Sequence, residues 1–169
     1  QYPNIKLRMR NVDSVNFTPY QLRYWRVTYT PVPEGAIAPN LLFSTRDTVE
    51  VGEPINFKIA FKNISEVNFD SLRVKITVTN KDNVLTNMAV PRQKALVVND
   101  TVQLNYTIPT GAVPGTNYLF VDFNPDNDQP EQHHFNNFIF RTIYVKPDSL
   151  NPLMDVTFDG IHILNRDIV

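Results

Sequence analysis

Alternation of apolar and polar residues with a period of two constrains this chain more than any other feature. It runs through residues 55–62, 72–79 and 102–108, each of which places four apolar side chains on one face. Successive side chains of a β-strand point to opposite sides, so each segment is predicted to be a half-buried strand. Burial of one such side chain contributes about 1.5–3 kcal/mol, so three strands of this kind are enough to anchor a core.

Two more strands are predicted on either side of a long polar connection. Residues 118–123 and 138–144 are rich in aromatic and β-branched residues, and residues 124–137 between them are dense in Asp, Asn and Pro. This pattern is typical of two strands joined by a connection longer than a tight hairpin.

The order of these segments indicates the fold class. Turn-rich stretches separate the strands, and no window shows the 3.6-residue apolar period of an amphipathic helix. Strands with one wet face, joined by turns, indicate an all-β antiparallel sandwich of two sheets with essentially no helix. The sandwich is expected over residues 41–146.

The flanking residues are predicted to belong to other modules. Residues 1–40 would hold preceding strands, at 5–9 and 22–30, followed by a proline-rich connection. Residues 147–169 would open a following β module with a hairpin at an Asp-Gly turn.

Composition excludes several function classes. The 169 residues have a net charge of −1 and no basic block, which argues against nucleic-acid binding. No run approaches the roughly 18 apolar residues of a membrane span, so no membrane insertion is expected. The chain has no Cys, which excludes thiol catalysis and disulfides within it, and it has no catalytic-serine or phosphate-loop motif. It is therefore predicted not to be an enzyme and to need no cofactor, apart from the calcium considered below.

The polar connection resembles a known family. Asp126-Asn127, Glu131 and Asn136-Asn137, after an alternating strand that ends in Asn-Ile-Ser, are similar to the CARDB family of bacterial adhesion-related domains. The resemblance implies an immunoglobulin-like β-sandwich of about seven or eight strands. The family commonly has a second acid before the Asn pair, where this chain has two histidines.

A second resemblance covers nearly the whole chain. The segments that carry it are Arg23-Tyr-Trp-Arg-Val, residues 124–132, His134-Phe-Asn-Asn and residues 151–164. They resemble the region downstream of the peptidase domain in gingipain-like C25 cysteine peptidases of type IX secretion. This implies a secreted, outer-membrane-associated surface protein whose catalytic His and Cys lie in an upstream domain.

The acids of the polar connection are candidate calcium ligands. Asp126, Asp128 and Glu131 offer the hard oxygens that calcium prefers. Their spacing differs from an EF-hand, and the alternative is a loop whose Asp and Asn side chains bind their own backbone. Both interpretations are kept, with the structural one favoured.

The amide residues are interpreted as structural. The candidates for this loop and strand motif are Asn124, Asp126, Asn136 and Asn137. The two Asn residues that begin the last strand are expected to satisfy buried backbone groups, with surface recognition as the alternative. The adjacent His133 and His134 are predicted to be solvated loop residues.

An aromatic segment near the N-terminus is a candidate contact surface, formed by Tyr24, Trp25, Arg26 and Tyr29. Its side chains could cover a neighbouring domain or stack on a sugar ring, and a domain interface is favoured.

These observations predict a non-catalytic structural and interaction module. It would position neighbouring domains of the same polypeptide or dock a secretion-machinery partner. The alternative is a stand-alone adhesin module that binds glycan or protein at the cell surface.

Overall fold

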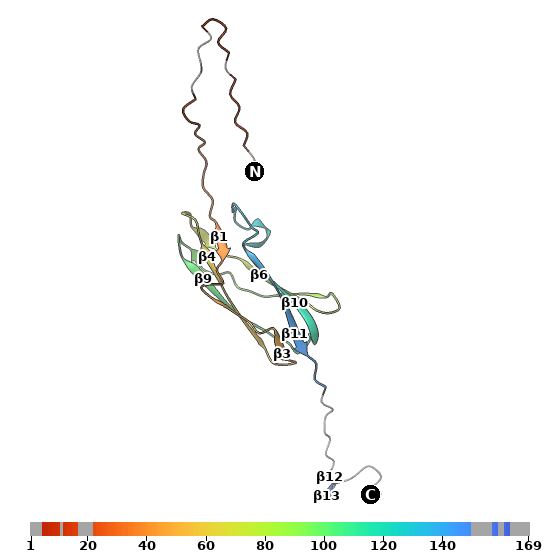
Figure 1. Ribbon diagram of the computed structural model, residues 1–169. Helices are drawn as coiled ribbons and strands as arrows, with labels where there is room; N and C mark the ends of the chain where they lie inside the picture. Colours follow the sequence, from red (N-terminus) through yellow and green to blue (C-terminus); the bar gives the residue numbers. More distant parts are fainter. Residues whose placement is uncertain (1–4, 11, 17–21, 150–156, 159–160, 163–169) are drawn as a thin grey trace. The chain divides into compact units, whose positions relative to one another are not determined.

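The alternating segments form strands that pack into two facing layers (Figure 1). The computed structural model describes residues 5–10, 12–16, 22–149, 157–158 and 161–162. Within them the all-β prediction is confirmed, because the helical content is one 3-10 turn, η1 (Pro125–Asn127). No helix in this part of the chain is long and apolar enough to cross a membrane.

The chain divides into two units, residues 1–30 and residues 31–169. The described residues of the first unit form no strand, so the strands predicted at 5–9 and 22–30 are wrong. A strand requires backbone hydrogen bonds to a neighbouring strand, and no partner strand is found among the described residues of this unit. The strand-forming residue types in these two segments were therefore not enough to predict a strand.

The first sheet is built around β4 (Ile55–Asn63). β9 (Thr101–Ile108) pairs with β4 along its length, and β1 (Gly35–Ile37) and β2 (Phe43–Ser44) pair with its other edge, all antiparallel. β1 lies in the stretch predicted to be a connection. The sheet therefore begins before residue 41, and the predicted boundary is corrected to include β1.

The second sheet has the order β3-β11-β10-β6-β7. Its strands are β3 (Thr48–Glu50), β11 (Phe138–Lys146), β10 (Gly115–Phe123), β6 (Val74–Thr79) and β7 (Leu85–Met88). The predicted strands on either side of the polar connection are β10 and β11, which pair antiparallel over eight residues each. The pairing of β3 with β11 is parallel, whereas the sequence suggested only antiparallel pairs.

Two short strand pairs complete the fold. β5 (Phe69–Ser71) pairs with β8 (Ala95–Leu96), and β12 (Thr157–Phe158) pairs with β13 (Ile161–His162). The second pair is the hairpin predicted after residue 147, and its turn falls outside the described residues.

The core lies between the two sheets. Phe57, Val74 and Leu104, one from each alternating segment, are all buried. Phe61 of β4 stacks on Phe123 of β10 with ring centroids 4.7 Å apart, which joins the layers. The period-two pattern therefore identified the inward faces of the long strands.

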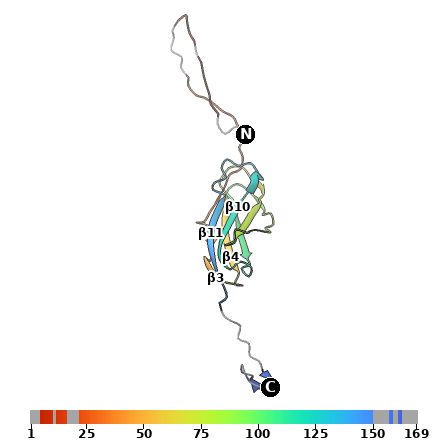
Figure 2. The same ribbon diagram turned by 90° about the vertical axis from the view of Figure 1, so that its right-hand side faces the viewer.

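The chain enters the sandwich through β1 at one end and leaves it after β11 at the other end (Figures 1 and 2). Gly35 of β1 pairs with Asn63 at the end of β4, whereas Lys146 of β11 pairs with Glu50, shortly before β4 begins at Ile55. Nine residues of extended strand span about 30 Å, so this is the distance between the two ends.

Candidate functional site

The polar connection between β10 and β11 packs against the residues just before β1. Two glutamates separated by almost one hundred residues, Glu34 and Glu131, form the centre of this contact. Together with Asn124, Asn136 and Asn137 they are called the carboxylate network below. All five residues are buried or partly buried.

Glu131 is the most enclosed acid of the network, with 1% of its side chain exposed. Its carboxylate accepts hydrogen bonds from the Gly35 backbone N–H at 3.2 Å, from Asn137 Nδ2 at 2.6 Å and from Asn124 Nδ2. A carboxylate has about four acceptor positions, so three of them are used inside the protein. Glu131 thereby ties β1 to both ends of the connection.

Glu34 makes the complementary contact from the other side. Its Oε2 accepts the backbone N–H groups of Gln132 and His133, each at 2.9 Å, and its Oε1 accepts Asn136 Nδ2 at 3.1 Å. Hydrogen bonds to an ionised carboxylate are stronger than neutral ones. Glu34 therefore fixes the connection at the point where the chain joins the first sheet.

Asn124 shapes the start of the connection. Its backbone is left-handed, with φ 56°, and its side-chain oxygen and nitrogen bind the backbone N–H and C=O of Gln129, both at 2.8 Å. Asp126 and Asn127 also have positive φ. Asn and Asp adopt this conformation more readily than other side chains, which explains why the connection is rich in them.

Burial changes the acid strength of two carboxyls at this end of the sandwich. Burial raises the pKa of Glu131, and the hydrogen bonds from Asn124 and Asn137 offset part of the effect. Burial also raises the pKa of Asp122, against the influence of His134, whose Nε2 lies 2.9 Å from Asp122 Oδ1. His134 is thus a partly buried partner of Asp122 rather than the solvated loop residue that was predicted.

The three predicted calcium ligands are not brought together. Asp126 is exposed and lies 3.6 Å from Arg73, Asp128 accepts a 2.7 Å hydrogen bond from Arg92, and Glu131 points into the network. In the described part of the chain no group of three or more His, Cys, Asp or Glu side chains is placed to hold a metal ion. Each of the three carboxylates therefore has a different partner in the structure, and calcium binding by this set remains a prediction.

The predicted role of the Asn pair also needs correction. Asn137 was expected to satisfy buried backbone groups through its side chain, and so was Asn136. Their Nδ2 atoms instead donate to Glu131 and Glu34, respectively. Sequence reasoning missed Glu34, because a single acid between Pro33 and Gly35 gives no local signal of a partner so distant in the chain.

The aromatic segment predicted as a contact surface lies in the first unit. Tyr24, Trp25 and Tyr29 are exposed there, as is Arg26. Their role as a domain interface or glycan contact remains a prediction.

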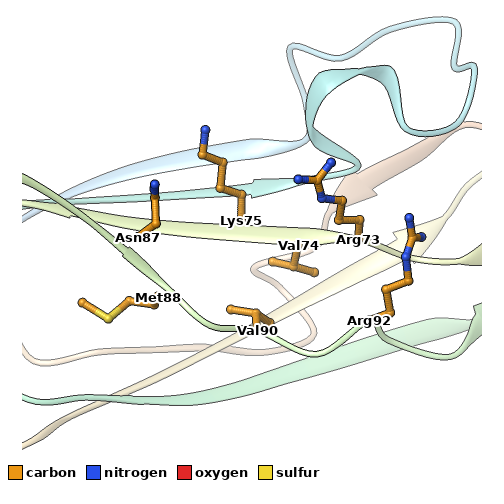
Figure 3. Close-up of a pocket in the computed structure, with 7 residues that line it drawn as sticks. All are labelled: Arg73, Val74, Lys75, Asn87, Met88, Val90 and Arg92. Carbon is orange, nitrogen blue, oxygen red and sulfur yellow. The ribbon is translucent and has the colours of Figure 1, made fainter.

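A groove lies where β7 diverges from β6, beyond the last pair Ile76–Met88 (Figure 3). Its lining residues are Arg73, Val74, Lys75, Asn87, Met88, Val90 and Arg92. Arg92 is engaged by Asp128 and by the Ser71 carbonyl, both at 2.7 Å. The lining combines the basic side chains of Arg73, Lys75 and Arg92 with apolar side chains and the amide of Asn87.

No protein-family model matches the sequence, and no curated protein matches it significantly. Solved structures do match. The crystal structure of a CARDB domain from Pyrococcus furiosus, in complex with di-metal ions, is 18% identical and covers 72% of this chain and 100% of that chain, with a TM-score of 0.54. The solution structure of the same domain is 17% identical and covers 69% of this chain and 98% of that one, also with a TM-score of 0.54.

A β-glucosidase from Listeria innocua in complex with glucose is also similar over a small part of its length. It is 14% identical, with a TM-score of 0.51, and the match covers 68% of this chain and 16% of the enzyme. At these identities the likeness shows the fold alone. The chain therefore has the immunoglobulin-like β-sandwich fold that is found in CARDB domains.

Proposed function

We propose that this chain is a non-catalytic structural and interaction module that holds neighbouring domains of a larger secreted protein in a fixed relation. The observation that supports this most is that the start of β1 and the end of β11 lie at opposite ends of the sandwich. A module that is joined to its neighbours at opposite ends acts as a spacer about 30 Å long.

Both ends are fixed to the sandwich. At the first end, Glu34 and Gly35 are bound to the connection through the carboxylate network. At the other end, the Lys146 carbonyl accepts the Val51 N–H at 3.0 Å, and Lys146 Nζ lies 2.9 Å from Glu50. Anchored ends transmit the orientation of one domain to the next, whereas flexible ends do not.

A non-catalytic role agrees with the chemistry of the acids. Glu34 and Glu131 use their oxygens on donors of the protein itself, and the chain has no Cys. The parent would be a C25-peptidase-like protein of type IX secretion, associated with the outer membrane at the cell surface. This context rests on the sequence resemblance. The partners would be the neighbouring domains and a secretion-machinery or surface protein.

The test replaces Glu34 with Ala in the full-length protein, with the exposed acid Glu66→Ala as the matched control. We expect Glu34→Ala to increase the rate of limited proteolysis in residues 31–34, because the chain is no longer fixed there. The amount of parent protein retained at the cell surface should fall as well. Unchanged proteolysis and unchanged retention would count against a spacer function.

The alternative is an adhesin module that binds glycan or protein, and the exposed Tyr24, Trp25 and Tyr29 favour it. It predicts that the isolated chain binds a glycan array or cells and that Trp25→Ala abolishes binding. Binding that persists in Trp25→Ala would exclude this segment as the contact.

A further inference from the structure

The outer face of the second sheet is aromatic where β10 and β11 pair. The side chains on this face form four cross-strand pairs, which are Thr116–Tyr144, Tyr118–Thr142, Phe120–Phe140 and Asp122–Phe138. Five of these eight residues are aromatic, and the core-facing residues Leu119, Val121, Ile143 and Val145 alternate with them. Both faces of the hairpin are thus apolar, although one of them lies outside the core.

The aromatic rings contact one another and form one continuous surface, not a set of separate exposed residues. Phe120 lies 4.5 Å from Phe140 and 5.9 Å from Phe138, measured between ring centroids, and Phe138 lies 6.0 Å from Phe140. Phe140 is 65% exposed, and Tyr118 is 50% exposed. A contiguous exposed apolar surface on a soluble domain marks an interaction site, whereas single exposed apolar residues do not. The five aromatic residues Tyr118, Phe120, Phe138, Phe140 and Tyr144 are called the aromatic face below.

The charged residues on the rest of this surface occur in pairs of opposite sign, and Lys146 and Glu50 form one such pair beside Tyr144. On β6 the residues opposite Tyr118, Phe120 and Asp122 are Thr79, Thr77 and Lys75. The only charged residues in these rows are therefore Asp122 and Lys75, which have opposite signs and face each other across the strands. Two copies of such a surface can approach about a two-fold axis without placing like charges together at its centre.

The area of the outer face of the second sheet sets the strength of a contact between two identical domains. Five strands spaced about 4.8 Å apart, each contributing about six residues of 3.3 Å, give a surface of roughly 450 Å². Two such surfaces correspond to roughly 900 Å² of total area, below the about 1,200 Å² at which standard protein interfaces begin. Such a pair therefore has the size of a small, transient interface, and its two copies exchange readily with the monomer.

We propose that the aromatic face binds a second copy of this chain, with the two second sheets packed face to face. Phe120, Phe138 and Phe140 have no polar tip, so they favour an apolar partner surface over the hydroxyl groups of a glycan. Aligned sheet packing at about 10 Å is the usual way to cover such a face. The centre of the contact is the Phe120–Phe140 pair, and its rim is formed by Tyr144, Thr79 and Lys75.

The experiment is sedimentation equilibrium of the 169-residue chain from about 1 µM upward, the range in which small interfaces dissociate. The wild type is expected to show a monomer–dimer equilibrium. Phe140→Asp should weaken dimerisation at least about tenfold, because it places a charge at the centre of the contact. Tyr118→Asp is a second variant on the same face and should act in the same direction.

Phe135→Asp is the matched control. Phe135 is also an exposed phenylalanine, but it lies in the connection rather than on the sheet, so dimerisation should be unchanged. Urea midpoints identify any variant that fails to fold. A wild type that stays monomeric over the whole range overturns the proposal, even if another protein or a glycan then binds the face. A dimer that withstands both substitutions on the face overturns it as well.

Discussion

Replacing Glu131 tests whether the carboxylate network is structural. Glu131→Ala removes the acceptor of Asn137 Nδ2, Gly35 N–H and Asn124 Nδ2. Asn124 keeps a second acceptor, the Gln129 carbonyl at 2.8 Å. Asn137 keeps only a 3.3 Å contact with His134 Nδ1, and for the Gly35 N–H no second acceptor is seen in the described residues. Two buried donors therefore lose their acceptor.

An unsatisfied buried donor costs about 1–3 kcal/mol, so Glu131→Ala should lower the free energy of unfolding by about 2–4 kcal/mol. Asp126→Ala is the matched control, because Asp126 belongs to the same connection and was also a predicted calcium ligand. Its side chain is 68% exposed and makes one long contact with Arg73, so the change should stay within about 0.5 kcal/mol.

The assay is urea denaturation followed by far-ultraviolet circular dichroism, which reports the strands directly. The reasoning is refuted if Glu131→Ala costs less than about 1 kcal/mol, below the penalty for even one unsatisfied donor. Equal destabilisation by both variants, together with stabilisation of the wild type alone by added calcium, would support the metal-site interpretation.

Three further changes test other parts of the structure. Gly35→Ala should destabilise the fold by about 1–3 kcal/mol, because its Cβ would lie 2.2 Å from the ring of Phe61; a neutral effect in thermal unfolding would contradict the position of β1. Asn63→Ala removes the 2.7 Å and 3.1 Å hydrogen bonds to the carbonyls of Val67 and Leu96 and should cost about 1–3 kcal/mol by urea titration. The third change is in pH. The pKa of Glu131 is raised in the folded state, so between about pH 4 and that raised pKa the folded state binds more protons than the unfolded state. The contribution of Glu131 to the free energy of unfolding therefore falls as the pH rises through this window. The difference in stability between wild type and Glu131→Gln should therefore be larger at the acid end of that window than at pH 7, and a constant difference would refute it.

The long strands could be predicted because the alternation that determines which side chains are buried lies within each segment. Residues 55–62 alternate, and β4 indeed buries Ile55, Phe57, Ile59 and Phe61. Short strands such as β1 could not be predicted in the same way, because three residues show no period. β1 exists because β4 offers it an open edge, and that edge depends on the whole sheet.

The position of the candidate site in the sequence was predicted, but the contacts of its residues were not. The connection was identified from its density of Asp and Asn, and four of its residues do belong to the carboxylate network. Local spacing, however, could not reveal that Arg73 and Arg92 would engage Asp126 and Asp128, or that Glu34 would bind the far end. These partners are set by the sheet order, which places segments far apart in sequence at one end of the sandwich.

The aromatic face was not predicted as a surface, although its strands were predicted. Residues 138–144 lack alternation, and this was interpreted only as a sign of a strand. In a sandwich with one wet face, a strand without alternation has apolar side chains on both faces, so one set lies outside the core. The sequence therefore already contained the signal for an apolar face outside the core, and the register of β10 with β11 was needed to assign its residues.

The carboxylate network and the aromatic face meet at neighbouring residues. Asn137 binds Glu131, and the next residue, Phe138, begins β11 and belongs to the aromatic face. Loss of the network should therefore disturb Phe138 more than Phe140, which lies two residues farther along β11 and is paired with Phe120. Because Phe140 is held by the strand ladder, its substitution tests association without testing the network. Dimerisation that depended on Glu131 but not on Phe140 would place the contact at the end of the sandwich instead of on its sheet.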